Sequence, residues 1–206
     1  MRLPLTWCLI AMAPAIGAQS VPIPANTGLC LTAEEAALVQ LVNAYRVQNG
    51  KAALPATRWL STTGQFKVWD RIANGAVGGD CNSHSWSGAM PSLWQAVCYT
   101  PDHAQSAQMW AKPRQISANV YSGNGFEITA DSGAPMTAAQ ALSQWQASPA
   151  HRDVILNQGA WAGVTFRGLG VGIAGNYAVV WFGDAVDSAG PLNACQNETV
   201  FVATFE

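Results

Sequence analysis

Apolar residues recur every three or four positions over two stretches in the first half of the chain, which is the spacing of amphipathic helices. The first stretch follows Thr32, which stands three residues before Glu35 in the spacing of a capping box. Gly50 supplies a backbone conformation that commonly ends a helix, so this pattern predicts a helix over residues 33–49. The second stretch predicts a helix that ends near Gly75, with its apolar stripe in the core. That stripe consists of Trp59, Leu60, Phe66, Trp69 and Ile72.

Shorter helices are expected in the middle of the chain. Thr137 precedes Gln140 by three residues, a second capping-box spacing, and opens an apolar pattern that continues through Trp145. Ser148 and Pro149 have the sequence of an N-cap followed by proline in the first helical position. Further short helices are expected over residues 91–98, 102–111 and 150–156.

The last third of the chain changes its period. Apolar residues are interleaved with glycines over residues 164–173, a turn sequence follows at 174–176, and residues 177–182 are a continuous apolar run. This pattern predicts a β-hairpin, and residues 199–205 could add an edge strand. Helices first and a hairpin late indicate an α+β layering in a single domain.

The first eighteen residues have the layout of a secretory signal peptide. Arg2 precedes a nearly uncharged run that ends in small residues at Ala18, where we expect cleavage. The run is shorter than the roughly 20 apolar residues of a membrane span, so we expect no transmembrane anchor. Cys8 lies too early to be a lipid-attachment cysteine. Residues 19–29, which are rich in proline and glycine, are interpreted as an extended leader.

The composition excludes two classes of protein. Hydrophobic residues make up 50% of the chain and charged residues 11%, which is unlike a disordered chain. The formal net charge is −2, whereas a nucleic-acid partner calls for a basic face. We therefore expect a globular domain with no nucleic-acid partner.

The cysteine count indicates two disulfides. Removal of Cys8 with the signal peptide leaves Cys30, Cys81, Cys98 and Cys195, an even set in an exported chain. Three pairings are possible, and we favour Cys81 with Cys98, which closes a loop, and Cys30 with Cys195, which ties the two ends together. The competing interpretation is a zinc site, but no Cys-x-x-Cys spacing supports it.

Three residues suggest a chemical site. His84 and His151 lie in segments rich in small and polar residues, and Glu127 lies in an apolar, glycine-rich stretch where a carboxylate is costly without a partner. Two imidazoles and one carboxylate form a plausible set of ligands for a divalent metal, with a fourth position for water. Ser148 is interpreted as a helix cap rather than a nucleophile. We expect His103 to face solvent.

Four segments, in order along residues 33–186, resemble motifs of the CAP superfamily, which comprises cysteine-rich secretory proteins, antigen 5 and pathogenesis-related 1 proteins. The Ser-Pro-Ala-His-Arg element at residues 148–152 is the most specific of them and resembles bacterial members. The four segments are Leu41–Arg46 with Gly50 and Leu54, His84-Ser85, Gln144–Leu156, and Gly170–Ile173 with Tyr177–Gly183.

The resemblance implies a fold and a site. The fold is an α+β, three-layer α-β-α sandwich with a central antiparallel sheet. In many members a cleft holds two histidines and two acids that bind zinc or magnesium. His84 and His151 match the histidines and Glu127 matches one acid, so the implied binding cleft contains His84, Glu127, Ser148 and His151. The chain departs from the pattern at Ile128, where the family has asparagine, and at Ser148, where many members have the second acid.

The resemblance also sets the expected organisation: a CAP domain over residues 30–186 and a C-terminal extension over 187–206. It leaves three functions open. The first is a secreted binding module for a small hydrophobic ligand or a cell-envelope component, with Trp86 and Trp94 either lining the groove or packed in the core. The second is a hydrolase in which His84 and His151 hold Zn²⁺ or Mg²⁺ and Glu127 is a ligand or general base. The third is an exported domain that recognises a host or envelope component through its loops. The expected location is extracellular or periplasmic.

Overall fold

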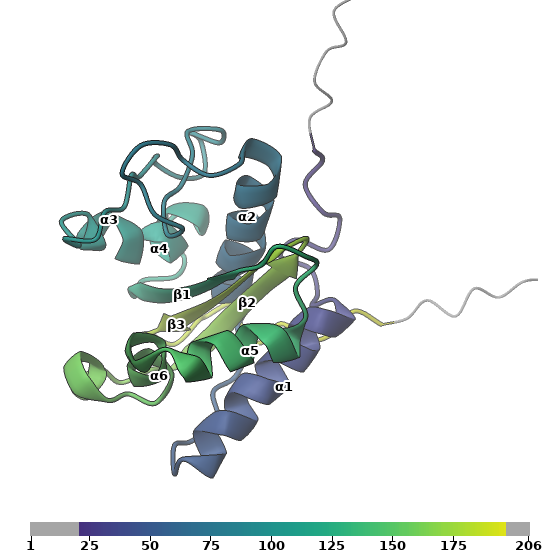
Figure 1. Ribbon diagram of the computed structural model, residues 1–206. Helices are drawn as coiled ribbons and strands as arrows, with labels where there is room; N and C mark the ends of the chain where they lie inside the picture. Colours follow the sequence, from purple (N-terminus) through teal and green to yellow (C-terminus); the bar gives the residue numbers. More distant parts are fainter. Residues whose placement is uncertain (1–20, 197–206) are drawn as a thin grey trace, which may run out of the picture.

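The computed structural model describes residues 21–196, so the expected signal peptide and the expected edge strand at 199–205 lie outside the described residues. Ten elements follow one another along the chain (Figure 1). They are α1 (Ala33–Gln48), α2 (Arg58–Asn74), α3 (Ser106–Trp110), α4 (Lys112–Ile116), β1 (Gly125–Asp131), α5 (Ala138–Ala147), α6 (Pro149–Ile155), the 3-10 helix η1 (Gly159–Trp161), β2 (Gly168–Ala174) and β3 (Tyr177–Gly183).

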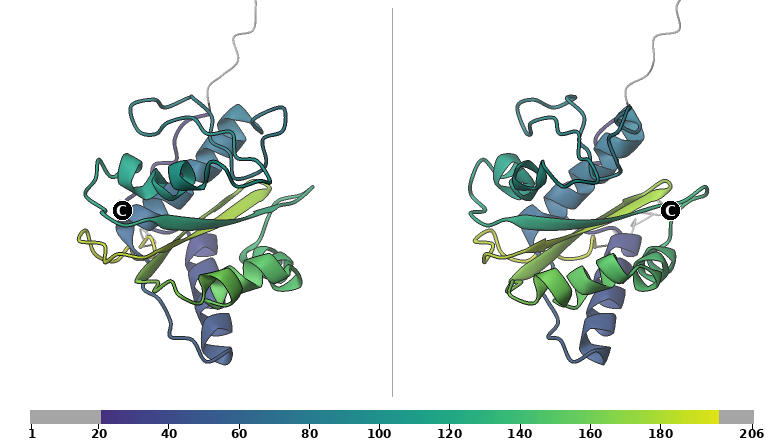
Figure 2. Two further views of the ribbon diagram at one scale, coloured as in Figure 1. Left: turned by 90° about the vertical axis from the view of Figure 1, so that its left-hand side faces the viewer. Right: turned by 60° about the vertical axis from the view of Figure 1, so that its left-hand side comes forward.

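The three strands form one antiparallel sheet in the order β1-β3-β2, which places β1 at an edge. Helices α2, α3 and α4 cover one face of the sheet, and α1, α5 and α6 cover the other (Figures 1 and 2). This arrangement confirms the expected three-layer α-β-α sandwich with a central antiparallel sheet.

Each face of the sheet has its own hydrophobic core, because side chains alternate along a strand. In β3, Val180 and Phe182 pack with α1 and α5 on one face. Val179 and Trp181 pack with α2 on the other face. All seven residues of β3 are buried, as expected for the central strand of a sheet that is covered on both sides.

The face of β2 that meets α2 is made of glycine. A Cβ on Gly170 would lie 2.0 Å from the carbonyl carbon of Leu60, and one on Gly172 would lie 2.2 Å from the carbonyl oxygen of Gly64. Helix α2 therefore lies directly on the strand backbone. Several polar residues of α2 that the sequence pattern did not place in the core are buried, while Ile72 of the expected apolar stripe is 39% exposed. The buried polar residues are Ser61, Thr62, Thr63, Gln65, Lys67 and Asp70.

Both capping boxes are present. Thr32 caps α1 with Glu35, and Thr137 caps α5 with Gln140, so these two helices begin where the sequence predicted. Helix α6 begins at Pro149 as expected, although the Ser148 side chain makes no capping hydrogen bond.

Two segments differ from the sequence-based expectation. Residues 91–98, expected as a helix, form a turn at 91–93 and then an isolated bridge between Val97 and Trp86. The helix expected over residues 102–111 is shortened to α3. Pro113 lies in the first turn of α4 and does not end the helical region. Strand β1 was not predicted, because its short apolar run is interrupted by Glu127.

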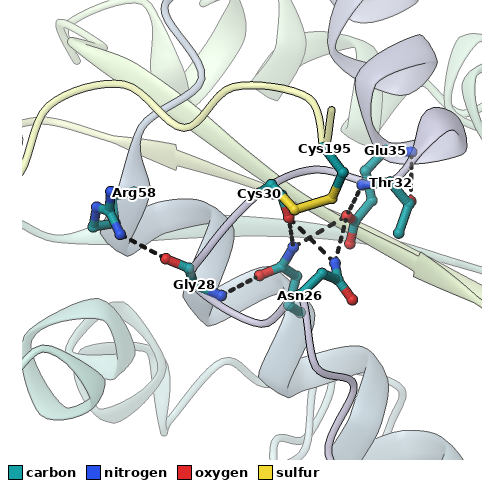
Figure 3. Close-up of a disulfide and its surroundings, with 8 residues drawn as sticks. Asn26, Gly28, Cys30, Thr32, Glu35, Arg58 and Cys195 are labelled. Carbon is teal, nitrogen blue, oxygen red and sulfur yellow. Dashed lines mark hydrogen bonds between the residues drawn. A yellow bond between two sulfur atoms is a disulfide. The ribbon is translucent and has the colours of Figure 1, made fainter. Parts of the chain in front are cut away.

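The two disulfides pair as favoured, Cys30 with Cys195 and Cys81 with Cys98. The first joins the two ends of the described chain (Figure 3). Residues 25–29 form turns instead of an extended leader. In this turn region Asn26 Nδ2 donates to Glu35 Oε2 at 3.4 Å, and Gln65 Nε2 donates to the same oxygen at 3.1 Å.

Candidate functional site

A cavity of about 510 Å³ lies at the free edge of β1, between the two helical layers. Its lining draws on both layers. Met109 and Trp110 come from α3 on one side, and His151 and Val154 come from α6 on the other. The edge strand contributes Glu127, so the three residues with candidate chemistry, His84, Glu127 and His151, line one cavity.

His84 and Glu127 are in direct contact. His84 Nδ1 lies 2.8 Å from Glu127 Oε2, and the side chain of Glu127 is 2% exposed whereas that of His84 is 23% exposed. A carboxylate only accepts hydrogen bonds, so Nδ1 carries the hydrogen and donates it. In the neutral ring, Nε2 is then the nitrogen with a free lone pair.

The loop that carries His84 is fixed at several points. The backbone N–H of His84 donates to Asn82 Oδ1 at 3.0 Å. Ser83 hydrogen-bonds through its hydroxyl to Thr129 of β1 at 2.8 Å, and Tyr177 Oη donates to the Ser83 carbonyl at 2.8 Å. The position of His84 relative to the sheet therefore rests on contacts with β1 and β3.

Glu127 faces Trp181 across the β1-β3 ladder. Within residues 21–196, neither Glu127 Oε1 nor Trp181 Nε1 has a hydrogen-bond partner, and both atoms are buried. Burial lowers the pKa of Lys67, and the negative charge of Glu127 is the largest influence that opposes this shift. The charge of Glu127 thus favours the protonated form of the buried Lys67.

His151 lies in the first turn of α6, where the Ser-Pro sequence at the start of the helix places it. Burial lowers the pKa of its imidazole, and the charge of His84 lowers it further. The effect of His84 on the pKa of His151 indicates an electrostatic interaction between the two imidazoles. Both effects favour a neutral His151, the form that can bind a metal or accept a hydrogen bond.

The third histidine of the chain also lines the cavity. His103 is exposed, as expected, but it belongs to the cavity lining. Its Nδ1 lies 3.0 Å from Tyr99 Oη, and the ring of Tyr99 lies edge-on to the ring of His84, with centroids 5.5 Å apart. No motif in the sequence marked His103 or Tyr99, because their proximity to the site arises from a loop that folds back towards His84.

The remaining wall of the cavity is aromatic and aliphatic. The sequence did not identify these residues as part of a site, since isolated tryptophans in an apolar pattern are typical of a core. They include Met109, Trp110, Ile128, Val154, Trp161 and Trp181. Trp86 and Trp94 do not line the cavity; both are buried, and their rings pack together with centroids 5.0 Å apart. Ser148 is not among the lining residues either.

Over the part of the chain that the structure describes, no group of three or more His, Cys, Asp or Glu side chains is arranged to hold a metal ion. The binding of Zn²⁺ or Mg²⁺ therefore stays a prediction. No helix in that part of the chain is both long and apolar enough to cross a membrane.

No protein-family model and no curated protein matches the sequence. Among solved structures, the chain is similar to an extracellular protein containing an SCP domain from Bacillus anthracis, with 18% identity and a TM-score of 0.52 over 74% of this chain and 40% of that protein. SCP is another name for the CAP domain. The chain has the CAP fold. This result confirms, for the fold, the resemblance that the sequence motifs indicated.

Two further solved structures match part of the chain. One is a cysteine-rich secretory protein from Staphylococcus aureus, with 12% identity and a TM-score of 0.47 over 74% of this chain and 39% of that protein. The other is an outer surface protein from Borrelia burgdorferi, with 15% identity and a TM-score of 0.46 over 73% of this chain and 91% of that protein. The CAP fold of this chain thus spans less than half the length of the first two proteins.

Proposed function

We propose that this protein is a secreted CAP-fold binding module that holds a small, largely hydrophobic molecule in the cavity beside β1. The observation that supports the proposal best is the composition of that cavity. A volume of about 510 Å³ lies within the range of ligand pockets, which are mostly apolar and carry a few convergent polar groups. Here the apolar wall carries three tryptophans, and His84, Glu127 and His151 supply the polar groups.

Two observations support export. Both disulfides are of the kind that persists in oxidising compartments. The similar protein from B. anthracis is an extracellular protein. The natural ligand would then be a small hydrophobic molecule or an apolar part of an envelope or host component.

The chain has a second, smaller cavity, and it suits this function less well. Its volume is about 230 Å³, and it lies between the leader, which includes Val21 and Pro22, and α2, which includes Trp69. Its one acidic residue, Glu35, is already engaged by Thr32 and Gln65. No histidine lines it.

Blocking the cavity mouth tests the binding proposal. Ala150 is exposed and lines the cavity, so Ala150→Phe fills the mouth at little cost to folding. Ala147→Phe, on an exposed alanine outside the lining, is the matched control. Titration of the mature protein with alkyl-chain and sterol ligands, followed by tryptophan emission, should give saturable binding that Ala150→Phe weakens and Ala147→Phe preserves. Equal binding by both variants would place the ligand elsewhere.

A metal-assisted hydrolase is the second candidate, and the His84-Glu127 contact favours it. A histidine that binds a metal commonly donates its other ring N–H to a carboxylate, and Glu127 provides that support for His84. The residues fit zinc in ligand type, with His84 and His151 as ligands, better than magnesium, which prefers oxygen. Bound zinc would supply a Lewis acid and an acidified water in a site that has no closed set of three protein ligands.

Calorimetry with zinc separates the two candidates. One-to-one binding that is lost in both His84→Ala and His151→Ala would support a metal centre and justify a search for hydrolysis. No heat of binding, or binding that survives both substitutions, would leave the cavity as a site for an organic ligand alone. His103→Ala controls for a histidine at the same cavity that the proposed metal centre does not use.

A further inference from the structure

Two residues that line the cavity each hold a buried polar atom without a hydrogen-bond partner. Within residues 21–196, neither Glu127 Oε1 nor Trp181 Nε1 makes a hydrogen bond, and the other unpartnered buried atoms of that range lie outside the lining. The side chain of Glu127 is 2% exposed, and Trp181 is fully buried. Buried polar groups are nearly always paired in folded proteins, because an unpaired one costs free energy. A molecule bound in the cavity is therefore a source of the missing partners.

Glu127 and Trp181 are direct neighbours on the sheet. They are partners in the β1-β3 ladder, and the side chains of directly opposed residues lie on the same face, with their Cβ atoms about 5 Å apart. Strand β1 is at the edge, so Glu127 lies beside the cavity and Trp181 lies one strand further in. One small group of a ligand can therefore serve both residues.

The neighbouring polar groups of the protein are already engaged. His84 donates to Oε2, the other oxygen of Glu127. The charge of Glu127 favours the protonated form of Lys67, but Lys67 Nζ donates to the Ser85 carbonyl and lies 5.3 Å from the centroid of the Trp86 ring. The cavity lining contains no lysine or arginine. The protein thus leaves one acceptor and one donor to be satisfied by the ligand.

These two atoms together select one kind of polar group. A carboxylate oxygen only accepts hydrogen bonds, and an indole N–H only donates. A ligand carboxylate would accept from the indole, but it cannot donate to Oε1 and is repelled by the charge of Glu127. A ligand ammonium would donate to Oε1, but it cannot accept from the indole. A hydroxyl group donates and accepts at once.

We infer that the ligand carries a hydroxyl group that donates to Glu127 Oε1 and accepts from Trp181 Nε1. The inference rests on the proposed function, because it concerns the ligand of the same cavity. Both atoms are shielded from solvent in this structure, so the carboxylate or the indole turns towards the cavity as the hydroxyl enters. The apolar part of the ligand then lies against Trp110 and Trp161, whose rings both pack edge-on against Phe126 of β1. The ligand class is an apolar alcohol.

Three probes with one chain length and different head groups test this inference. At pH 8, decanol presents a neutral hydroxyl, decanoate an anion and decylammonium a cation, and their dissociation constants can be measured by tryptophan emission. The wild-type protein should bind decanol about fivefold more tightly than either charged probe, because the hydroxyl makes one hydrogen bond more.

Glu127→Gln is the most informative variant. If the glutamine oxygen accepts from His84, the amide nitrogen takes the place of Oε1 and turns an acceptor into a donor. Two donors then face the ligand and the negative charge is gone, so the ratio of the two affinities should shift towards decanoate by about tenfold. Trp181→Phe, which keeps an aromatic ring and removes the N–H, should lower the preference for decanol over decylammonium. Ser106→Ala removes a different hydroxyl from the lining and should preserve the wild-type order.

The outcomes separate the inference from the proposed function. If none of the three probes binds, the binding function fails for alkyl ligands, and the inference fails with it. If the probes bind but the wild-type protein does not prefer decanol, or if Glu127→Gln leaves its preference unchanged, the binding function stands and the hydroxyl site is overturned. If circular dichroism shows that Glu127→Gln does not fold, the Trp181→Phe comparison decides, and an unchanged ratio of decanol to decylammonium affinity overturns the site.

Discussion

His84 Nδ1 lies 2.8 Å from Glu127 Oε2, and this contact joins a loop on one face of the sheet to the edge strand β1. It fixes which imidazole nitrogen carries the hydrogen, and it satisfies one oxygen of a carboxylate that is almost fully buried. The other oxygen, Oε1, has no partner within residues 21–196. Glu127 therefore depends on His84 for this hydrogen bond, and its charge in turn favours the protonated form of Lys67.

Glu127→Gln should destabilise the protein. The substitution weakens a charge-assisted hydrogen bond to His84 and removes the negative charge that offsets the buried Lys67, so we expect a loss of about 1–3 kcal/mol in the free energy of unfolding. Chemical denaturation of the mature, oxidised protein measures this loss.

Two further variants test whether Lys67 is the reason. In a Lys67→Met background the same Glu127→Gln change should cost less, because the buried cation is gone; the difference is a double-mutant coupling. Asp80→Asn, on an exposed acid that makes no ion pair within residues 21–196, is the control and should change the stability little. Equal costs in both backgrounds would show that Lys67 and Glu127 are not coupled.

Lys112→Met should stabilise the protein most at low pH. Burial, and then the charge of Lys67, lowers the pKa of Lys112 to about 7 from 10.5. Between these two pH values the Lys112 side chain is protonated in the unfolded chain and neutral in the folded protein. The free energy of unfolding therefore rises with pH over this range. Below pH 7 the folded protein bears a buried ammonium group. Methionine removes that cost, so the gain in Tm should be larger at pH 6 than at pH 9.

The comparison needs a surface control. Lys51→Met, on a partly exposed lysine, should shift Tm by a similar small amount at both values of pH. A gain from Lys112→Met that is the same at pH 6 and pH 9 would contradict the assignment of a charge burial cost to Lys112.

The sequence predicted those elements whose signals are local. Thr32 with Glu35 and Thr137 with Gln140 mark helix starts because a capping box is formed within four residues. The hairpin of β2 and β3 was predicted for the same reason. Strand β1 was not, because its seven residues are stabilised by pairing with β3, which lies about fifty residues later, and not by their own pattern.

The residues of the candidate site likewise fall into those that sequence motifs predicted and those that they did not. His84, Glu127 and His151 were found because motifs marked them, and the structure brings them to one cavity. Tyr99 and His103 were not found, since their position depends on how the loop after Cys98 folds. Lys67 lies in a helix whose apolar pattern did not include it. Its burial depends on the loop at Ser85 and Trp86 and on Tyr177 of β3, which the sequence does not place beside α2.

Loss of the two disulfides should have different effects. Replacement of Cys30 and Cys195 by serine removes a cross-link between residues that are 165 positions apart in the sequence. Replacement of Cys81 and Cys98 removes a cross-link between residues that are 17 positions apart. Chain entropy gives a loss of roughly 2–5 kcal/mol for each, larger for the longer loop. The loop closed by Cys81 and Cys98 contains His84 and is followed directly by Tyr99, and both residues line the cavity. Loss of this disulfide should therefore also weaken ligand binding. Denaturation of both double variants, and their titration with alkyl-chain ligands, check this order, and reversed effects would contradict it.

Gly170→Ala should be among the most destabilising single-methyl changes in the protein. Its Cβ would lie 2.0 Å from the Leu60 carbonyl carbon and 2.1 Å from the Ser61 nitrogen, and backbone atoms on a packed helix cannot rotate away as a flexible side chain can. Helix α2 would have to move off β2, so we expect a loss of about 3 kcal/mol in the free energy of unfolding. Gly163→Ala is the matched control, because nothing lies within 4 Å of its added Cβ. Thermal or chemical denaturation compares the two variants, and a Gly170→Ala protein as stable as Gly163→Ala would mean that α2 does not rest on the strand backbone.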